Sequence, residues 1–235
     1  MEYVGEFLGT FILVLLGNGV VAGSVLKDTK ATSTGWVMIT LGWAAAVTIG
    51  VLVSGFYSPA HINPAMTIAM ATIGAISWDV VPGFIIAQLL GAMLAAIVLY
   101  VHYLPHWEIS DADSVLASFS TAPAKRDVFS NLFGEMLSTA VLVVGVMAMG
   151  PNNLAGGIAP IMVGLIVLAI GLSLGATTGY AINPARDLGP RIVHQFLPIK
   201  GKRDSDWGYA WIPVVGPILG GIIGAVLYNM VLSGL

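Results

Sequence analysis

The chain contains 235 residues, of which 57% are hydrophobic and 9% are charged, with no cysteine and a formal net charge of -3. A soluble domain carries about 25% charged residues, so this composition excludes an ordinary soluble protein and indicates a chain surrounded by lipid. The lack of cysteine excludes a disulfide framework and thiolate chemistry. The nine basic residues form no cluster, which argues against a nucleic-acid partner.

Six apolar stretches are long enough to cross a bilayer, which takes about 20 residues. The first follows the acidic Glu2 rather than a basic flank, so we interpret it as a membrane span and not as a signal peptide. In chain order the predicted spans are Tyr3–Leu26, Thr34–Gly55, Val80–Tyr103, Val128–Gly150, Gly156–Ala176 and Tyr209–Val231. We therefore predict a single all-α transmembrane domain over residues 1–235.

Two further apolar stretches, Pro64–Ile76 and Pro184–Leu197, are too short to span, and each begins with an Asn-Pro pair. Asparagine is a good N-cap, and proline suits the first turn of a helix, where its missing N–H would have no partner. Irregular backbone at membrane depth is tolerated only where protein buries it or where it borders a wet cavity. The sequence thus predicts two re-entrant half-helices beside a pore.

The two halves of the chain repeat each other. The run GEFLGT at residues 5–10 returns as GEMLST at residues 134–139, and HINPA at residues 61–65 returns as AINPA at residues 181–185. With three spans in each half, the second half must be inverted relative to the first. We predict inverted repeats over residues 1–103 and 128–235, joined by a loop at residues 104–127. This loop is either a lid or a simple solvated connection, and we favour the connection.

The predicted half-helices place two positive helix ends at one point of the pore. Asn63 and Asn183 would cap these ends, and their side-chain amides would donate hydrogen bonds to a passing hydroxyl or water oxygen. A cation or hydrated proton would be repelled there. Neutral hydroxylated solutes fit this chemistry best.

The repeat and its motifs Asn63-Pro64-Ala65 and Asn183-Pro184-Ala185 resemble the aquaporin superfamily over essentially the whole chain, and most closely the bacterial glycerol facilitators. The resemblance implies an hourglass fold, a homotetramer with one pore in each protomer, and no cofactor. It also implies an outer constriction at four positions set by their spacing from the motifs. In this sequence they hold Trp43, Gly171, Tyr180 and Arg186.

The residue types at the four positions suit a polyol. Trp43 and Tyr180 would offer apolar ring faces to its carbon side, and the permanent charge of Arg186 would donate to its hydroxyls and repel cations. Gly171 leaves room where water-selective relatives typically carry histidine. Tyr180 departs from the phenylalanine more usual in glycerol facilitators, and its hydroxyl would either add a polar contact or narrow the pore.

Other residues have expected roles that rest on the resemblance. Glu6 and Glu135, the only acids placed well inside spans, would brace the loops that precede the half-helices. Proton coupling is the alternative for an intramembrane acid. Asp187 would brace the loop behind the constriction, or act as an acid favoured in a first helical turn. The pore-lining backbone carbonyls would belong to Ala60, His61, Gly179 and Ala181. His61 is alternatively a packing residue, and no metal site is expected.

We therefore predict a passive channel for glycerol, water and other small neutral solutes. A water-selective channel is the alternative, a proton-coupled transporter is a weaker one, and an enzyme is not expected because no metal motif or nucleophile-base pair is present. All basic residues lie in or beside the connections after spans one, three and five. The positive-inside rule would place these connections in the cytoplasm, whereas the resemblance places them outside, and we follow the resemblance. The chain is then expected in the plasma membrane with cytoplasmic termini.

Overall fold

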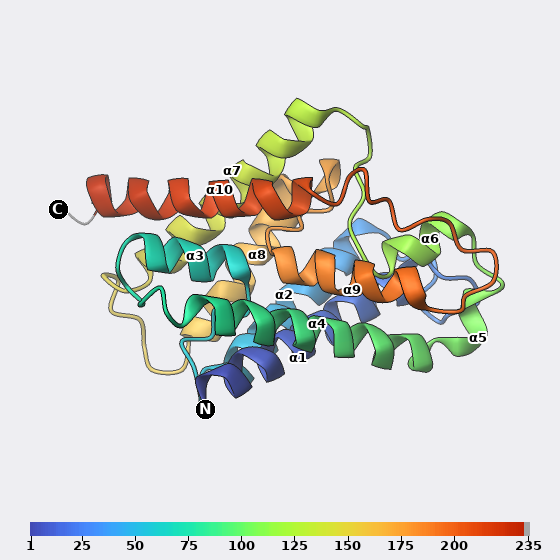
Figure 1. Cartoon of the computed structure of the whole chain (residues 1–235), viewed down its shortest axis with the longest axis horizontal. Coiled ribbons are helices and arrows are strands. Elements are labelled where there is room, and N and C mark those ends of the chain that lie inside the picture. The colour runs from blue at the N-terminus through green and yellow to red at the C-terminus, as the bar shows by residue number, and fades with distance from the viewer. Residues whose placement is uncertain (233–235) are drawn as a thin grey trace.

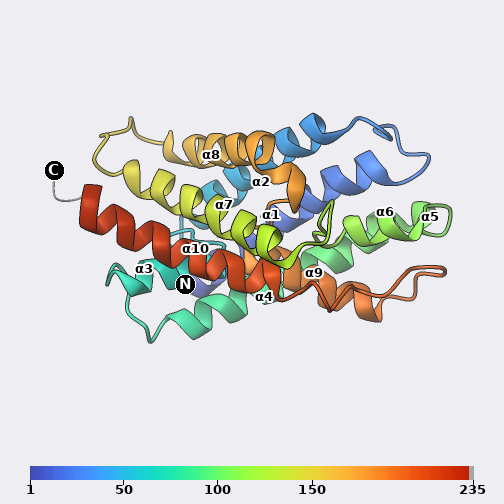
Figure 2. The ribbon, with the colours of Figure 1, turned by 90° about the horizontal axis from the view of Figure 1, so that it is seen from above.

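The computed structural model describes residues 1–232, and their regular secondary structure is entirely helical (Figure 1). Six long helices lie side by side along the long axis of the molecule, and two short helices lie among them (Figure 2). The long helices are α1 (Glu2–Val25), α2 (Trp36–Ser54), α4 (Val81–His102), α7 (Val128–Ala148), α8 (Ala159–Ser173) and α10 (Ile212–Leu227). The short ones are α3 (Pro64–Thr72) and α9 (Pro184–Phe196). The predicted architecture is confirmed.

The fifth span is shorter than predicted. Among residues 1–232, five helices are long and apolar enough to cross a membrane, α10 being continued by the π-helical segment η2 (Tyr228–Leu232), whereas α8 has 15 residues. A helix of that length is about 22 Å long. The predicted span Gly156–Ala176 counted flanking glycines as apolar, but Gly157 has a φ of 80° and Gly175 opens a 3₁₀ turn, η1 (Gly175–Thr177).

The half-helices approach each other from opposite ends of the molecule and meet near its centre (Figures 1 and 2). Helix α3 ends at Thr72, earlier than predicted, because Gly74 adopts a φ of 74° and the N–H of Ala75 turns back to the carbonyl of Met70 at 2.9 Å. A glycine in the left-handed region is a common helix terminator. Helix α9 ends at Phe196, close to its predicted end.

The two halves are interlocked. Helix α3 from the first half packs against α10 from the second, and α9 from the second half packs against α4 from the first. Glycines allow the long helices to approach closely: an ideal Cβ at Gly220 of α10 would lie 2.1 Å from the Met136 carbonyl of α7, and one at Gly91 of α4 would lie 2.3 Å from the Phe7 carbonyl of α1. Small residues are the usual means of close helix packing in membranes.

The connection at residues 104–127 differs from the prediction of a simple solvated loop. It contains two short helices, α5 (Leu104–Trp107) and α6 (Ala112–Ala117). Trp107 and Phe119 are buried in a cluster with Leu26 and Val193, and Asn18 of α1 donates a hydrogen bond to the Phe119 carbonyl at 3.0 Å. The prediction was wrong because the apolar residues of this segment cover the ends of α1 and α9 instead of facing water.

The connections that carry the basic residues lie together. The segments after α1, after α4 and after α9 are all at the right-hand end in Figure 2, and the two chain termini lie in the left half. This arrangement agrees with two membrane crossings, an even number, between successive members of the set.

Candidate functional site

The two half-helices begin in the same way, at a capping asparagine followed by proline. The Asn63 side-chain oxygen accepts a hydrogen bond from the Ala65 N–H at 2.8 Å, and the Asn183 oxygen accepts one from the Ala185 N–H at 3.0 Å. Each cap satisfies an N–H that a helix start leaves without a partner. The oxygen of each amide therefore faces its own helix.

The nitrogens of the same amides bridge the two halves. Asn63 donates a hydrogen bond from Nδ2 to the Ile182 carbonyl at 2.8 Å, and Asn183 donates one from Nδ2 to the Ile62 carbonyl at 2.8 Å. A primary amide has two N–H groups, so each asparagine keeps a second one. Both asparagines border the central cavity, which places these second donors beside it.

The backbone before each half-helix is strained at matching positions. Ala60 and Ile62 have φ values of 55° and 44°, and Tyr180 and Ile182 have values of 36° and 44°. Positive φ is a genuine outlier for a β-branched residue such as isoleucine, and such strain persists only where the surroundings enforce it. Two copies of the same strain indicate a backbone held in this form for what it places in the cavity.

Two buried carboxylates hold these strained segments. Glu6 accepts hydrogen bonds from the backbone N–H groups of His61 at 2.9 Å and Ile62 at 2.6 Å. Glu135 accepts the equivalent pair from Ala181 and Ile182, both at 2.9 Å. Both glutamates are fully buried, and neither borders the cavity. Their oxygens are thus occupied by the loops.

The surroundings of Glu6 extend its network. Ser58 donates to it at 2.8 Å and Gln88 of α4 donates to it at 2.8 Å. Gln88 also donates to Thr67, whose hydroxyl lies 3.1 Å from Nδ1 of His61. His61 therefore packs against α3 and also borders the cavity, so the packing and pore-lining interpretations are compatible.

A cavity of about 340 Å³ lies between the half-helices and the long helices. Its wall is mostly apolar, with residues from α2, α3, α7 and α8, and it reaches Met149 and Ala159 at the end of the molecule where α7 finishes and α8 begins. Of the four residues predicted to supply pore-lining carbonyls, Ala60, His61 and Ala181 border it, whereas Gly179 does not. Trp43, Tyr180 and Arg186 border it together.

The guanidinium of Arg186 lies over the indole of Trp43, with Cζ 4.0 Å from the ring centroid. No hydrogen bond from this guanidinium to protein is found within residues 1–232, although the residue is buried. A cation over a tryptophan face is attracted by the ring quadrupole. The donors of Arg186 are consequently free for a solute that enters the cavity.

Gly171 is placed differently from its three predicted neighbours, because it does not border the cavity. An ideal Cβ there would lie 2.9 Å from Cζ of Tyr180 and 2.9 Å from Cγ2 of Thr40. The room that glycine leaves at this position is filled by the tyrosine ring. Its effect on the cavity is therefore indirect, through the depth at which the Tyr180 ring sits.

The sequence model of the major intrinsic protein family matches residues 1–228. The chain belongs to this family. It is 56% identical over 228 residues to a Thermotoga maritima protein named "Probable glycerol uptake facilitator protein", covering 97% of each chain. It is 53% identical over 230 residues to the glycerol uptake facilitator protein of Streptococcus pneumoniae, covering 97% of this chain and 98% of that one. The solved aquaglyceroporin from Plasmodium falciparum superposes with a TM-score of 0.88 at 33% identity, covering 99% of this chain and 96% of that one.

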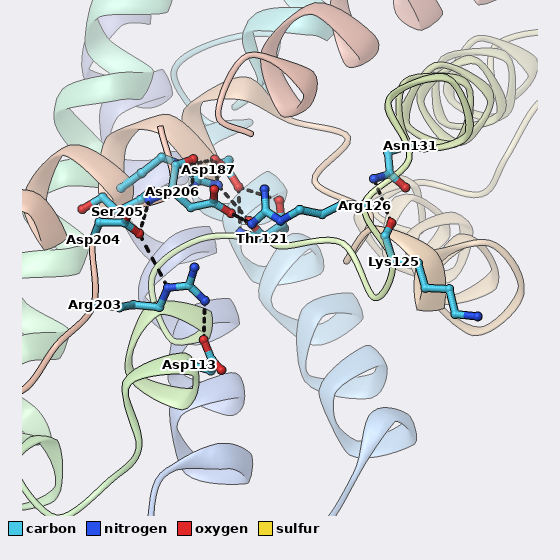
Figure 3. A network of polar contacts seen from close by, with 11 residues as sticks. Asp113, Thr121, Lys125, Arg126, Asn131, Asp187, Arg203, Asp204, Ser205 and Asp206 are labelled. Atoms are coloured by element: carbon cyan, nitrogen blue, oxygen red, sulfur yellow. Dashed lines mark hydrogen bonds and ion pairs between the residues drawn. The ribbon is translucent and has the colours of Figure 1, made fainter. Parts of the chain in front are cut away.

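Asp187 connects the second half-helix of this family member to the 104–127 segment (Figure 3). Its Oδ2 accepts hydrogen bonds from the Thr121 N–H at 2.7 Å and the Thr121 hydroxyl at 2.6 Å, and its Oδ1 accepts one from Nε of Arg191 at 2.8 Å. Arg191 also donates to the carbonyls of Thr121 and Ser205. The two oxygens of Asp187 thus hold Thr121 of the connecting segment and Arg191 of α9.

Two further ion pairs lie beside this network (Figure 3). Arg126 pairs with the buried Asp206, and Arg203 pairs with the exposed Asp113. An exposed pair such as Arg203–Asp113 contributes little to stability. The buried hub at Asp187 and Arg191 is the part of the network that positions α9.

Several residues of the site were missed by the sequence prediction. Ile62 and Ile182 supply the carbonyls that receive the cross-bonds, and their positive φ has no signal in a β-branched residue type. Gly17 receives the indole of Trp43, since an ideal Cβ there would lie 2.3 Å from the ring. Arg191 is different, because its spacing of four from Asp187 is visible in the sequence and places the two on one helix face.

Proposed function

We propose that this protein is a passive channel for glycerol and other small neutral solutes, including water. The observation that carries the proposal is the meeting of Trp43, Tyr180 and Arg186 at one part of the cavity. A polyol has a hydroxyl edge and a carbon edge, so it matches a wall with guanidinium donors on one side and ring surface on the other. The names of the relatives agree with this solute class.

Exclusion of ions follows from the same residues. The positive ends of α3 and α9 point toward the cavity centre, and Arg186 adds a full positive charge. The remaining N–H groups of Asn63 and Asn183 donate only, so a water between them is oriented with its oxygen toward them. The hydrogen-bonded chain of water is then interrupted at this point and cannot relay a proton across the pore.

The alternative functions are less consistent with these contacts. Proton coupling needs an acid that exchanges with the pathway, whereas the oxygens of Glu6 and Glu135 accept backbone N–H groups away from the cavity. A channel confined to water agrees less well with the relatives, which are named glycerol uptake facilitators. The protein is not an enzyme, because members of its family transport solutes without chemistry.

We further propose a plasma-membrane homotetramer with one pore in each protomer and cytoplasmic termini. Large apolar side chains on the outer faces of α2 and α4 are exposed, and lipid or neighbouring protomers would cover them. Examples are Val37, Leu41, Leu52, Ile86 and Leu90. Crosslinking in native membranes would test the tetramer, and protease accessibility of tagged termini would test the orientation.

The channel function is tested by osmotic re-swelling of proteoliposomes in glycerol, compared with water efflux in sucrose. Val167→Trp would place an indole in the cavity, and Leu165→Trp is the matched control because Leu165 lies on the exposed face of the same helix α8. We expect fast glycerol entry in the parent and the control, and entry at the level of empty liposomes in Val167→Trp. Unchanged flux in a folded Val167→Trp would mean that the pathway does not follow this cavity.

A further inference from the structure

Trp36, which opens helix α2, reaches the end of helix α8. Its Nε1 donates a hydrogen bond to the Gly171 carbonyl at 2.9 Å. Helix α8 ends at Ser173, so the Gly171 carbonyl is among the last four, which have no partner within the helix. The tryptophan therefore caps α8 from another helix and is itself fixed by that bond.

The Tyr180 ring lies along the same end of α8. An ideal Cβ at Gly175 would lie 2.4 Å from Cδ1 of Tyr180, and one at Gly171 would lie 2.9 Å from its Cζ. Distances below 3.0 Å mean that any side chain at either position would displace the ring. The two glycines form the surface on which the ring lies.

Trp36 closes a second side of this ring. The two rings meet edge to face, with centroids 5.6 Å apart and planes at 79°. The ideal Cβ of Gly175 would also lie 3.1 Å from Cζ2 of Trp36, so glycine, tyrosine and tryptophan meet at one point. Tyr180 borders the cavity and Trp36 does not. Trp36 thus stands behind the part of Tyr180 that a solute would meet.

Packing alone holds the tyrosine ring. Its hydroxyl is buried and has no hydrogen-bond partner within the part of the chain that the structure describes. A ring without a polar anchor keeps its position only if neighbouring atoms fill the space around it. The position of Tyr180 therefore depends on Trp36 as well as on Gly171 and Gly175.

We propose that Trp36 is a positioning residue that sets the size limit of the channel by holding Tyr180 at a fixed depth between the cavity and the end of α8. The inference rests on the proposed channel function. Removal of the indole opens space behind the tyrosine, and the ring can move back from the cavity. Longer linear polyols then gain access relative to glycerol.

The test measures glycerol and xylitol entry into proteoliposomes and takes the ratio of the two permeabilities. We expect Trp36→Ala to raise the xylitol-to-glycerol ratio by about threefold or more, because contacts of one methylene in such a site discriminate by about tenfold or more. Trp36→Phe keeps a ring but loses the N–H, and we expect an intermediate ratio. Trp78→Ala is the control, since Trp78 is 57% exposed and lies outside the site.

A double mutant separates positioning from general damage. In a Tyr180→Ala background the Trp36→Ala change should leave the ratio unaltered, because the residue through which it acts is gone. An additional change of equal size in that background would overturn the proposal, as would glycerol and xylitol permeabilities that fall together in Trp36→Ala. If Trp36→Ala does not assemble, Trp36→Phe carries the same comparison. Lack of glycerol entry in the parent would instead refute the proposed function, whatever the Trp36 variants do.

Discussion

Asn63 donates its side-chain N–H to the backbone carbonyl of Ile182, 119 residues further along the chain, at 2.8 Å. The inverse bond from Asn183 to Ile62 has the same length. The two half-helices are thereby tied to each other at their tips, beside the central cavity. Each asparagine amide therefore has three roles: its oxygen caps its own helix, one N–H bonds to the other half, and the second N–H lies beside the cavity.

Asn63→Asp separates these tasks. Aspartate caps a helix as well as asparagine does, but it has no N–H to donate and brings a negative charge to the Ile182 carbonyl. We expect a loss of about 1–3 kcal/mol in the free energy of unfolding and the appearance of sodium conductance. Asn153→Asp, in an exposed connection, is the control. Sodium flux in proteoliposomes and unfolding in mixed micelles measure the two effects. A variant that conducts no sodium and is as stable as the parent would contradict the assignment.

Glu135→Gln removes one acceptor from a strained loop. The glutamine nitrogen would face either the Ala181 or the Ile182 N–H and leave a buried donor unpaired, which costs about 1–3 kcal/mol. Because Glu6 holds the first loop in the same way, Glu6→Gln should cost a similar amount. Glu2→Gln, on an exposed residue, should change nothing.

The same variants test proton coupling. Glycerol entry in the folded fraction should be independent of an imposed pH gradient in the parent and in both variants. A gradient-dependent rate in the parent that is lost in Glu135→Gln would establish coupling instead of bracing.

Gly171→Ala should narrow the cavity without entering it. Its methyl group would lie 2.9 Å from Cζ of Tyr180, so the ring must move toward the cavity. We expect glycerol permeability to fall by about tenfold while water permeability changes little. Gly156→Ala is the matched control, because an ideal Cβ there meets nothing within 4 Å. Stopped-flow light scattering measures both rates, and parental glycerol entry in Gly171→Ala would show that the ring is not confined.

Asp187→Asn tests the hub beneath the constriction. Asp187 and Arg191 are both fully buried, and removal of one partner of such a pair costs about 3–5 kcal/mol because the other charge stays buried. Asp113→Asn breaks an exposed pair with Arg203, for which about 0–1 kcal/mol is expected. Chemical unfolding in mixed micelles compares the two. Equal small losses would mean that the Asp187 hub does not stabilise the fold.

Much of the fold could be predicted from the chain because the signals are local. Apolar runs of bilayer length, proline after a capping asparagine, and the recurrence of the same short motifs predict the spans, the half-helices and their inverted repeat. Each depends on residues within a few turns of one another or on a repeated pattern. The ends of α3 and α8 were misjudged, since Gly74, Gly157 and Gly175 count little in an apolar average but terminate helices.

The same distinction between local signals and tertiary contacts applies to the site. The sequence by itself determined which residues could carry the chemistry: two amides, one arginine, two aromatic rings and two buried glutamates. Only the tertiary structure decided that Gly171 lies behind Tyr180, that Trp36 supports that ring, and that residues 104–127 cover the ends of α1 and α9. The physical reason is that these contacts depend on how the helices and the two halves pack together, in the case of Trp36 and Gly171 across 135 positions, and no local pattern along the chain records it.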